Sequence, residues 1–130
     1  ARGSGVRVQV DAVAASVGIE AAIPAGLVIN ELVTNAIKHA YPGEATGSVD
    51  VISREHPAEP QRLIVEIRDE GIGLPADWTA ESSSSLGMRI ADSLTRQLGS
   101  ALEVSSSAAG SRFSFSVPRL PEVVDNRSDA

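Results

Sequence analysis

Hydrophobic and polar positions alternate at the start of the chain and then recur at a helical spacing. Val6, Val8 and Val10 are separated by polar or charged residues, and this period of two predicts a half-buried strand. A second short strand is expected at about 14–17. Apolar residues three and four positions apart then predict a helix over 24–40, which starts with a proline that a first turn tolerates. Its apolar stripe consists of Ile29, Leu32, Val33, Ala36, Ile37 and Ala40.

The second half of the chain predicts two pairs of strands and another helix. Strands are expected at about 48–54, 62–69, 102–106 and 112–117. The helix is expected to end at Gly99 and to carry one apolar side, made of Leu86, Ile90, Ala91, Leu94 and Leu98. The grouping of strands and helices favours an α+β fold, since a regular strand–helix alternation is missing.

The predicted architecture is a two-layer α/β sandwich with helices on one face of a mixed, mostly antiparallel sheet. We expect a single domain over residues 5–118, because the predicted elements follow one another closely. Residues 119–130 are expected to form a flexible tail, since they contain no hydrophobic pattern after the last strand.

Composition narrows the class of protein. Hydrophobic residues make up 42% of the 130 positions, which is enough for a packed core. The net charge of −6 argues against nucleic acid as a partner, because a nucleic-acid-binding face is basic. The absence of cysteine excludes disulfides and zinc–sulfur sites. No apolar run approaches the ~20 residues of a membrane span and no signal peptide is visible. We therefore expect a cytoplasmic domain without direct membrane contact, in a full-length protein that is either soluble or membrane-anchored.

The first candidate site lies on the polar side of the predicted 24–40 helix. At roughly 100° per residue, Glu31, Asn35, Lys38 and His39 fall on one arc opposite the apolar stripe. An amide oxygen is a ligand that Mg²⁺ accepts beside phosphate oxygens, a carboxylate can orient an attacking group, and a lysine can meet a phosphate. An ordinary solvated helix face explains the same residues about equally well.

The second candidate site follows the strand predicted at 62–69. Asp69 ends the strand, and Gly71 and Gly73 come directly after it. Glycines allow a flat ligand to approach the backbone, and a partly buried carboxylate can accept a hydrogen bond from an exocyclic amine such as that of adenine. A tight turn is the simpler explanation of this segment alone. The glycine spacing also fits a dinucleotide fingerprint, but Pro75 and the polar residues after it do not open a helix there.

The third candidate site is the start of the second helix, at Ser85, Leu86, Gly87 and Met88. Free N–H groups and the helix dipole make a helix N-terminus suitable for phosphate. A plain serine N-cap explains this segment alone. In order and spacing, however, the three sites together predict a composite ATP site. The first site would face the metal and the phosphates, the second would face adenine, and the third would cap the phosphates.

Together these motifs resemble the N, G1 and G2 boxes of the GHKL superfamily, which includes histidine kinases, gyrase-type ATPases, Hsp90 and MutL and shares the Bergerat ATP-binding fold. The resemblance covers roughly residues 6–118 and is closest to blue-light (LOV) and HWE histidine kinases. It implies that Asn35 is the Mg²⁺ ligand, that Glu31 is a base or orients water, that Lys38 contacts phosphate, and that His39 lies beside the nucleotide.

The resemblance also implies that Asp69 binds the adenine amino group. The other nucleotide-binding positions it implies are Gly71, Gly73, Leu86, Gly87, Met88 and Ser111. Two departures from the family pattern stand out. The loop over 74–85 is short and has no separate phenylalanine-bearing box, so the lid over ATP is abbreviated. Glu70 replaces an asparagine that is common after the adenine aspartate.

The function implied is that of the catalytic ATP-binding domain of a two-component sensor histidine kinase. Such a domain binds Mg·ATP and transfers the γ-phosphate to a histidine on a dimerisation helix, which these 130 residues do not include, and a response-regulator receiver domain then takes the phosphoryl group. The isolated domain is expected to bind ATP without autophosphorylation. Two alternatives remain open: a serine protein kinase of the anti-sigma-factor type, and a non-catalytic nucleotide-sensing module.

Overall fold

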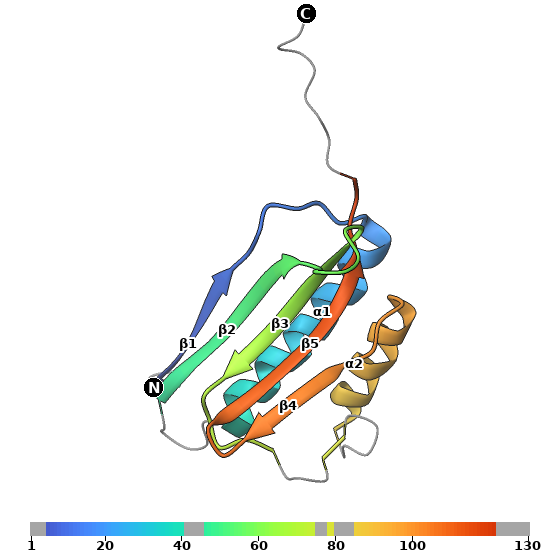
Figure 1. Cartoon of the computed structure of the whole chain (residues 1–130). Helices are drawn as coiled ribbons and strands as arrows, with labels where there is room; N and C mark the ends of the chain where they lie inside the picture. The colour runs from blue at the N-terminus through green and yellow to red at the C-terminus, as the bar shows by residue number, and fades with distance from the viewer. Residues whose placement is uncertain (1–4, 41–45, 75–77, 80–84, 122–130) are drawn as a thin grey trace, which may run out of the picture.

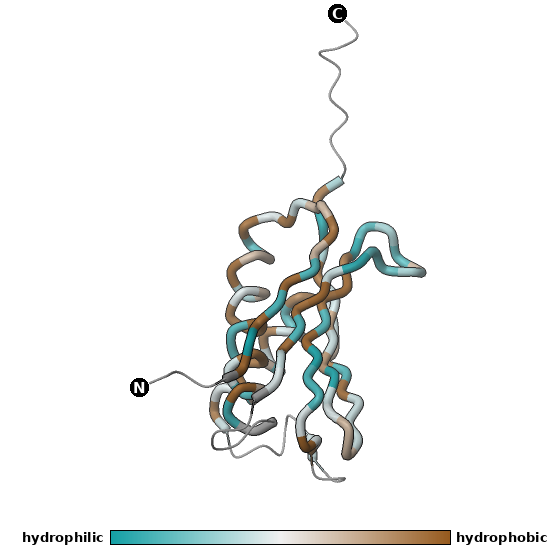
Figure 2. Tube along the Cα trace, turned by 90° about the vertical axis from the view of Figure 1, so that its left-hand side faces the viewer, coloured by the Kyte–Doolittle hydropathy of each residue, from teal (hydrophilic) through white to brown (hydrophobic). Residues whose placement is uncertain are grey.

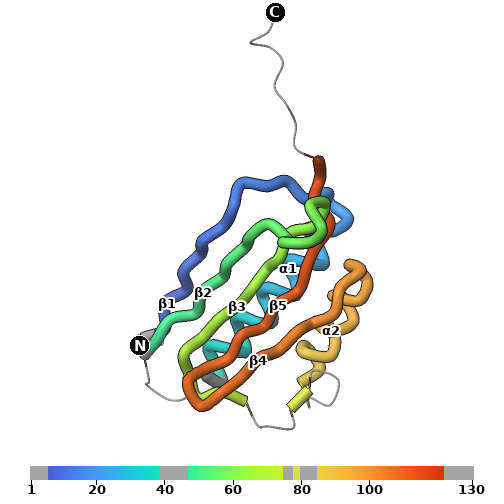
Figure 3. The backbone as a smooth tube through the Cα atoms, viewed as in Figure 1, coloured from blue at the N-terminus to red at the C-terminus, as the bar shows by residue number. Residues whose placement is uncertain are grey.

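The computed structural model describes residues 5–40, 46–74, 78–79 and 85–121 and shows a two-layer sandwich (Figure 1). In chain order, the elements are β1 (Gly5–Asp11), α1 (Ile19–Asn35), the π-helical turn η1 (Ala36–Ala40), β2 (Thr46–Glu55), β3 (Arg62–Asp69), α2 (Leu86–Gln97), β4 (Glu103–Ser107) and β5 (Gly110–Pro118). The strands form one sheet in the order β1-β2-β3-β5-β4. Strand β1 is parallel to β2 and the other neighbours are antiparallel. Both helices cover the same face (Figures 2 and 3), so the predicted architecture is confirmed.

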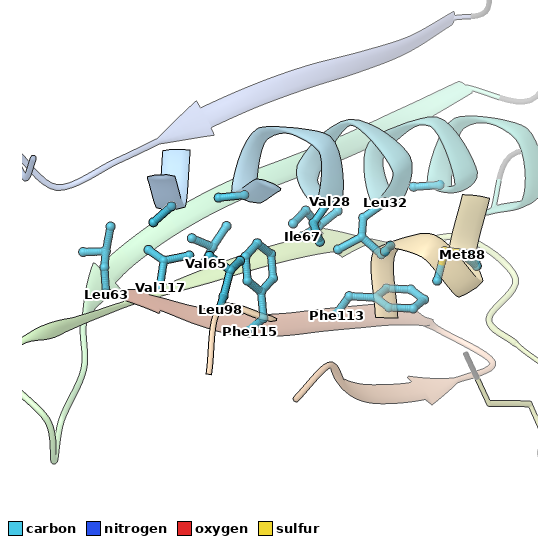
Figure 4. Packing of buried hydrophobic residues seen from close by; sticks show 14 of the residues in the cluster. Val28, Leu32, Leu63, Val65, Ile67, Met88, Leu98, Phe113, Phe115 and Val117 are labelled. Atoms are coloured by element: carbon cyan, nitrogen blue, oxygen red, sulfur yellow. The ribbon is translucent and has the colours of Figure 1, made fainter. Parts of the chain in front are cut away.

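The core lies between the helices and the two central strands. Leu63, Val65 and Ile67 of β3 alternate with outward-facing residues and are buried. In the register of the sheet they lie opposite Val117, Phe115 and Phe113 of β5, respectively. Side chains of α1 and α2 complete this cluster, among them Val28, Leu32 and Met88, together with Leu98, the residue after α2 (Figure 4). The period of two in these strands is therefore the pattern that builds the core.

Helix α1 begins earlier than predicted. Its N-cap is Gly18, whose carbonyl accepts the N–H groups of Ala21 and Ala22 at 3.0 and 2.8 Å. Pro24 consequently lies in the second turn, where its missing N–H leaves one carbonyl of the helix without its usual partner. Ala21 is buried against the sheet, and this burial supports a helical turn before the proline. The strand expected at 14–17 is absent, since these residues have no strand structure.

The predicted apolar side of α2 is confirmed in part. Ala91 and Leu98, the residue after the helix, are buried, and Leu94 packs against the core. Leu86 and Ile90 are 64% and 49% exposed, so their assignment to the apolar side was wrong. Met88 and Thr95 are buried instead. Thr95 can be buried because its hydroxyl donates to the carbonyl of Asp92 at 2.7 Å. Gly99 follows the helix with a φ of 78°, as predicted for the helix end.

The remaining predicted segments lie at the two ends of the chain. Val8 and Val10 of β1 are 47% and 70% exposed, so the strand is less buried than predicted. At the other end, Leu120 donates its backbone N–H to Ser16 at 2.8 Å, and the rest of the expected tail, 122–130, lies outside the described residues.

Within the described part of the chain, neither helix has the length and apolarity needed to cross a membrane.

A buried glutamate anchors the face of the sheet that the helices do not cover. Glu66 is 1% exposed and receives Arg68 at 2.7 Å, Arg54 at 3.1 Å and Arg112 at 3.5 Å. Burial alone would raise the pKa of Glu66. The hydrogen bonds from Arg68 and Arg54 and the charge of Arg112 outweigh it and hold this pKa below its ordinary value of 4.5. The ionised carboxylate therefore ties together β2, β3 and β5.

We expect Glu66→Gln to lower the free energy of unfolding at pH 7 by about 1–3 kcal/mol, because three arginines lose their charged partner. Since folding lowers this pKa, the contribution is complete above about pH 4.5 and disappears as the pH falls through the folded value. Urea unfolding at pH 7 and pH 3 should show a difference between variant and parent that shrinks at pH 3. Glu55→Gln is the control, because the Glu55 side chain is 78% exposed and its loss should have little effect. A difference that is independent of pH would contradict the assignment.

Candidate functional site

Asp69 is the last residue of β3 and lies on the face that the helices cover. The alternation that turns Leu63, Val65 and Ile67 toward the helices continues to Asp69, which is 6% exposed. Its Oδ1 accepts the backbone N–H groups of Gly71 at 2.9 Å and Ser111 at 3.3 Å. Asp69 therefore lies on the same side of the sheet as the polar face of α1, as the composite site requires.

The second carboxylate oxygen of Asp69 remains available. No hydrogen bond to Oδ2 is found within the described residues, and no fully buried side-chain oxygen there lacks a partner. Oδ2 is therefore open to solvent or to a ligand. Because two backbone donors fix Oδ1, the carboxylate is held in one orientation, with its free oxygen ready to accept a hydrogen bond.

Two glycines allow the backbone to close around Asp69. Gly110 has a φ of 142°, and a Cβ there would collide with the carbonyl oxygen of Asp69. Gly73 has a φ of 81°, and a Cβ there would collide with the carbonyl oxygen of Ser107. The predicted Gly73 therefore acts by letting the turn after β3 pack against the β4–β5 turn.

Ser111 holds the neighbouring position in β5. It pairs with Asp69 in the sheet register and is 6% exposed. Its hydroxyl lies 3.1 Å from the hydroxyl of Ser106, which also accepts the N–H of Leu74 at 2.7 Å. The sequence pointed to Ser111 but not to Ser106, which joins β4 to the turn after β3.

Glu31 of α1 lies directly against Gly87 in the first turn of α2. A Cβ at Gly87 would collide with the carboxylate carbon and both carboxylate oxygens of Glu31. The Glu31 carboxylate therefore occupies the space that a Cβ at position 87 would take. The polar face of α1 and the N-terminus of α2, predicted as separate motifs, are adjacent in the structure.

The other predicted residues of α1 are less enclosed. Asn35 is partly buried at the last position of the regular helix, and Lys38 is exposed in η1. The helix changes there to the wider π spacing, so the phase of 100° per residue does not continue to Lys38 and His39. The backbone of His39 belongs to η1, whereas its side chain lies outside the described residues.

The first turn of α2 has the features of an anion site. Ser85 is the N-cap, and its hydroxyl accepts the N–H of Met88 at 3.2 Å. The N–H groups of Leu86 and Gly87 have no partner within the described residues, as expected for a first turn. The Met88 side chain is buried in the core, and its N–H is bonded to Ser85.

Trp78 is a residue of this region that the motifs did not reveal. Its ring packs edge-on against Phe113 with 5.6 Å between centroids. It belongs to the short loop after β3, of which 75–77 and 80–84 lie outside the described residues. The chain contains one tryptophan, and its place in an otherwise polar loop was the available signal. It anchors this loop to the core beside β5.

Comparison with known proteins shows which family the chain resembles. The sequence profile of the histidine kinase-, DNA gyrase B-, and HSP90-like ATPases matches residues 20–121. Blue-light-activated histidine kinase 2 of Erythrobacter litoralis is 34% identical over 113 residues, which are 87% of this chain and 32% of that protein. Sensor histidine kinase PdtaS of Mycobacterium tuberculosis is 46% identical over 69 residues, 52% of this chain and 13% of that protein.

Solved structures agree with these sequence matches. The histidine kinase domain of the Erythrobacter litoralis EL346 blue-light-activated kinase has a TM-score of 0.77 at 33% identity, with 90% of this chain and 52% of that chain covered. The chain spans about a third of the length of its blue-light kinase relative. These matches confirm the resemblance to the blue-light kinases. The chain therefore belongs to the family of histidine kinase-, DNA gyrase B-, and HSP90-like ATPases, and within it is similar to the sensor histidine kinases.

Proposed function

We propose that this domain binds Mg·ATP between Asp69 and the N-terminus of α2 and presents the γ-phosphate to an acceptor histidine. The observation that carries the proposal is the contact of Glu31 with Gly87. It brings together the helix face suited to metal and phosphate and the helix end suited to anions. Asp69, on the same side of the sheet, supplies the remaining end of the site.

At the adenine end, Asp69 would accept a hydrogen bond from the exocyclic amine. Its Oδ1 is occupied by two backbone donors, which leaves Oδ2 for the ligand. A carboxylate discriminates between bases, because adenine presents an amine where guanine presents a carbonyl oxygen. The hydroxyl of Ser111 lies next to it and can hold adenine through a water molecule.

At the phosphate end, the N–H groups of Leu86 and Gly87 and the dipole of α2 favour negative charge. The carboxylate of Glu31 lies against the same turn, so bound phosphates and Glu31 would repel each other without a cation between them. Mg²⁺ fits this donor set, since it commonly takes few protein ligands together with phosphate oxygens. Asn35 would ligate it through its amide oxygen, and the exposed Lys38 would meet a phosphate.

The phosphoryl transfer would depend mostly on positioning and electrostatics. A nitrogen of the acceptor imidazole attacks the γ-phosphorus, the bond to the bridging oxygen breaks, and ADP leaves. Mg²⁺ held by Asn35 would neutralise charge on the phosphates. Glu31, next to the phosphate end, would orient the attacking imidazole or receive its proton. A response-regulator receiver domain would then take the phosphoryl group.

The acceptor histidine is proposed to come from a dimerisation helix outside these residues. His56 already has a local role: its Nδ1 accepts the N–H groups of Ala58 and Glu59 at 3.1 and 3.0 Å. It therefore stabilises the turn between β2 and β3. We propose that the domain acts inside the cell, where ATP is available, and that it binds ATP alone without phosphorylating itself.

Asp69→Asn is expected to weaken Mg·ATP binding by about tenfold to a hundredfold, the loss that corresponds to one charged hydrogen bond. The preference for ATP over GTP should fall as well, because the amide can present a donor to the adenine amine. Calorimetric titration with both nucleotides measures the two effects. Glu103→Gln, on the exposed strand β4, is the control. Unchanged ATP affinity in Asp69→Asn would rule out the proposed adenine site.

Asn35→Ala should weaken the dependence of ATP binding on Mg²⁺. The parent should bind ATP more tightly as Mg²⁺ is raised, because the cation separates the phosphates from Glu31. The variant should respond at least several-fold less, since one metal ligand is lost. Thr34→Ala, one position earlier on α1, is the control. An equal response to Mg²⁺ in parent and variant would remove Asn35 from the site.

Gly87→Ala tests the contact between Glu31 and the first turn of α2. Helix propensity makes alanine more stable than glycine by up to about 1 kcal/mol. In the parent background this gain should be smaller, because the Glu31 carboxylate must move away from the new Cβ. In the Glu31→Ala background the full gain should appear, since the carboxylate is absent. Urea unfolding of the parent, the two single variants and the double variant measures this difference, and an equal gain in both backgrounds would show that Glu31 does not lie against Gly87.

A further inference from the structure

Strand β1 is an edge strand with little of the usual protection of an edge. It forms the end of the sheet described here and pairs with β2 over all seven of its residues. Natural edge strands are commonly protected by proline, by charged side chains or by a bulge. Strand β1 has the sequence GVRVQVD and a continuous register, so it contains no proline and no bulge, and its two charges, Arg7 and Asp11, are of opposite sign. Its outer backbone groups therefore remain able to pair with another strand.

The side chains of β1 are arranged symmetrically about Gln9. Arg7 and Asp11 lie two positions before and after it, on the face away from the helices. Val8 and Val10 lie one position before and after it, on the face toward the helices. All four are exposed, and Arg7 and Asp11 have no ion-pair partner within the described residues. A strand with this pattern is complementary to a reversed copy of itself.

We propose that two copies of this chain associate through β1, antiparallel, about a two-fold axis at Gln9. In this register Arg7 lies opposite Asp11 of the second copy, and the symmetry forms this pair twice. Val8 lies opposite Val10 of the second copy, also twice. The interface is isologous, as a two-fold axis requires, and it joins the two sheets into one with the helices of both copies on the same face.

Other pairings of the edge fit less well. Centred on Val8, an antiparallel pair would place Arg7 opposite Gln9; centred on Val10, it would place Asp11 opposite Gln9. Neither register pairs opposite charges directly. A parallel in-register pair would place each residue beside its own copy, with Arg7 against Arg7. The register centred on Gln9 thus satisfies charge and apolar contacts together, and cross-strand pairs of both kinds stabilise sheets.

The helix layer leaves room for the second copy. Helix α1 packs over β3 and β5, away from β1, which explains why Val8 and Val10 are 47% and 70% exposed. Two copies would bring four of these valines together in one apolar strip on the inner face of the joined sheet. The strip removes exposed apolar area that the isolated chain cannot cover.

Charge exchange across the pair provides the test. Sedimentation equilibrium of the chain should show a monomer–dimer equilibrium. Arg7→Asp and Asp11→Arg should each raise the dissociation constant by about tenfold or more, since both symmetric pairs become repulsive. The double variant Arg7→Asp/Asp11→Arg should restore it, and an equimolar mixture of the two single variants should dimerise again. A monomer at every concentration, or a dimer that Arg7→Asp leaves unchanged, would overturn the proposal.

A disulfide tests the register independently. Residues directly opposite in an antiparallel pair have Cα atoms about 4.5–5.5 Å apart, which a disulfide can bridge. Because the chain has no cysteine, oxidised Gln9→Cys should form one covalent dimer, whereas Gln61→Cys in the exposed β2–β3 turn should not. Thermal unfolding followed by circular dichroism confirms that each variant is folded. Equal cross-linking of the two cysteine variants would contradict a two-fold axis at Gln9.

Discussion

The close approach of α1 and α2 at Glu31 and Gly87 is the contact on which the proposed site depends. The carboxylate of Glu31 lies where a Cβ at position 87 would be, so the absence of a side chain there lets it reach the first turn of α2. In the same pair of helices Leu32 and Met88 are both buried in the core, and the free amides of the first turn of α2 lie beside Glu31. Packing and the phosphate end of the site therefore depend on the same pair of helices.

Strand β3 fixes the position of Asp69, because its two faces make different contacts. The face toward the helices carries three buried aliphatic residues and then Asp69, so the strand leads from the core directly into the adenine end of the site. The opposite face carries Glu66 with its three arginines. A shift of one residue in register would exchange the two faces. The buried ion cluster and the core thus both hold Asp69 in place.

The fold was largely predictable because its signals are local, whereas the contacts that complete the site are not. The strand predicted at 62–69 has the same range in the structure as β3. The start of α1 was misplaced because a rule about Pro24 ignored the burial of residues before it. The buried side of α2 was predicted at Ala91, Leu94 and Leu98 but missed Thr95, because this residue can be buried only by satisfying its hydroxyl within the helix. The motifs identified the candidate site residues, but the proximity of Glu31 and Gly87 depends on partners that lie far apart in the sequence.

An acidic chain can bind a polyanion only if the electrostatic potential at the binding site is positive although the net charge of the chain is negative. The chain carries −6 overall, yet the proposed phosphate site combines the amides of α2, the dipole of that helix and Lys38. These act at short range, whereas the distant carboxylates are screened beyond about 10 Å at 0.1 M salt.

The proposed association uses the opposite end of the sheet, because β1 is one edge strand and β4 is the other. Pairing through β1 would therefore leave α2 open to nucleotide and to an acceptor helix in both copies.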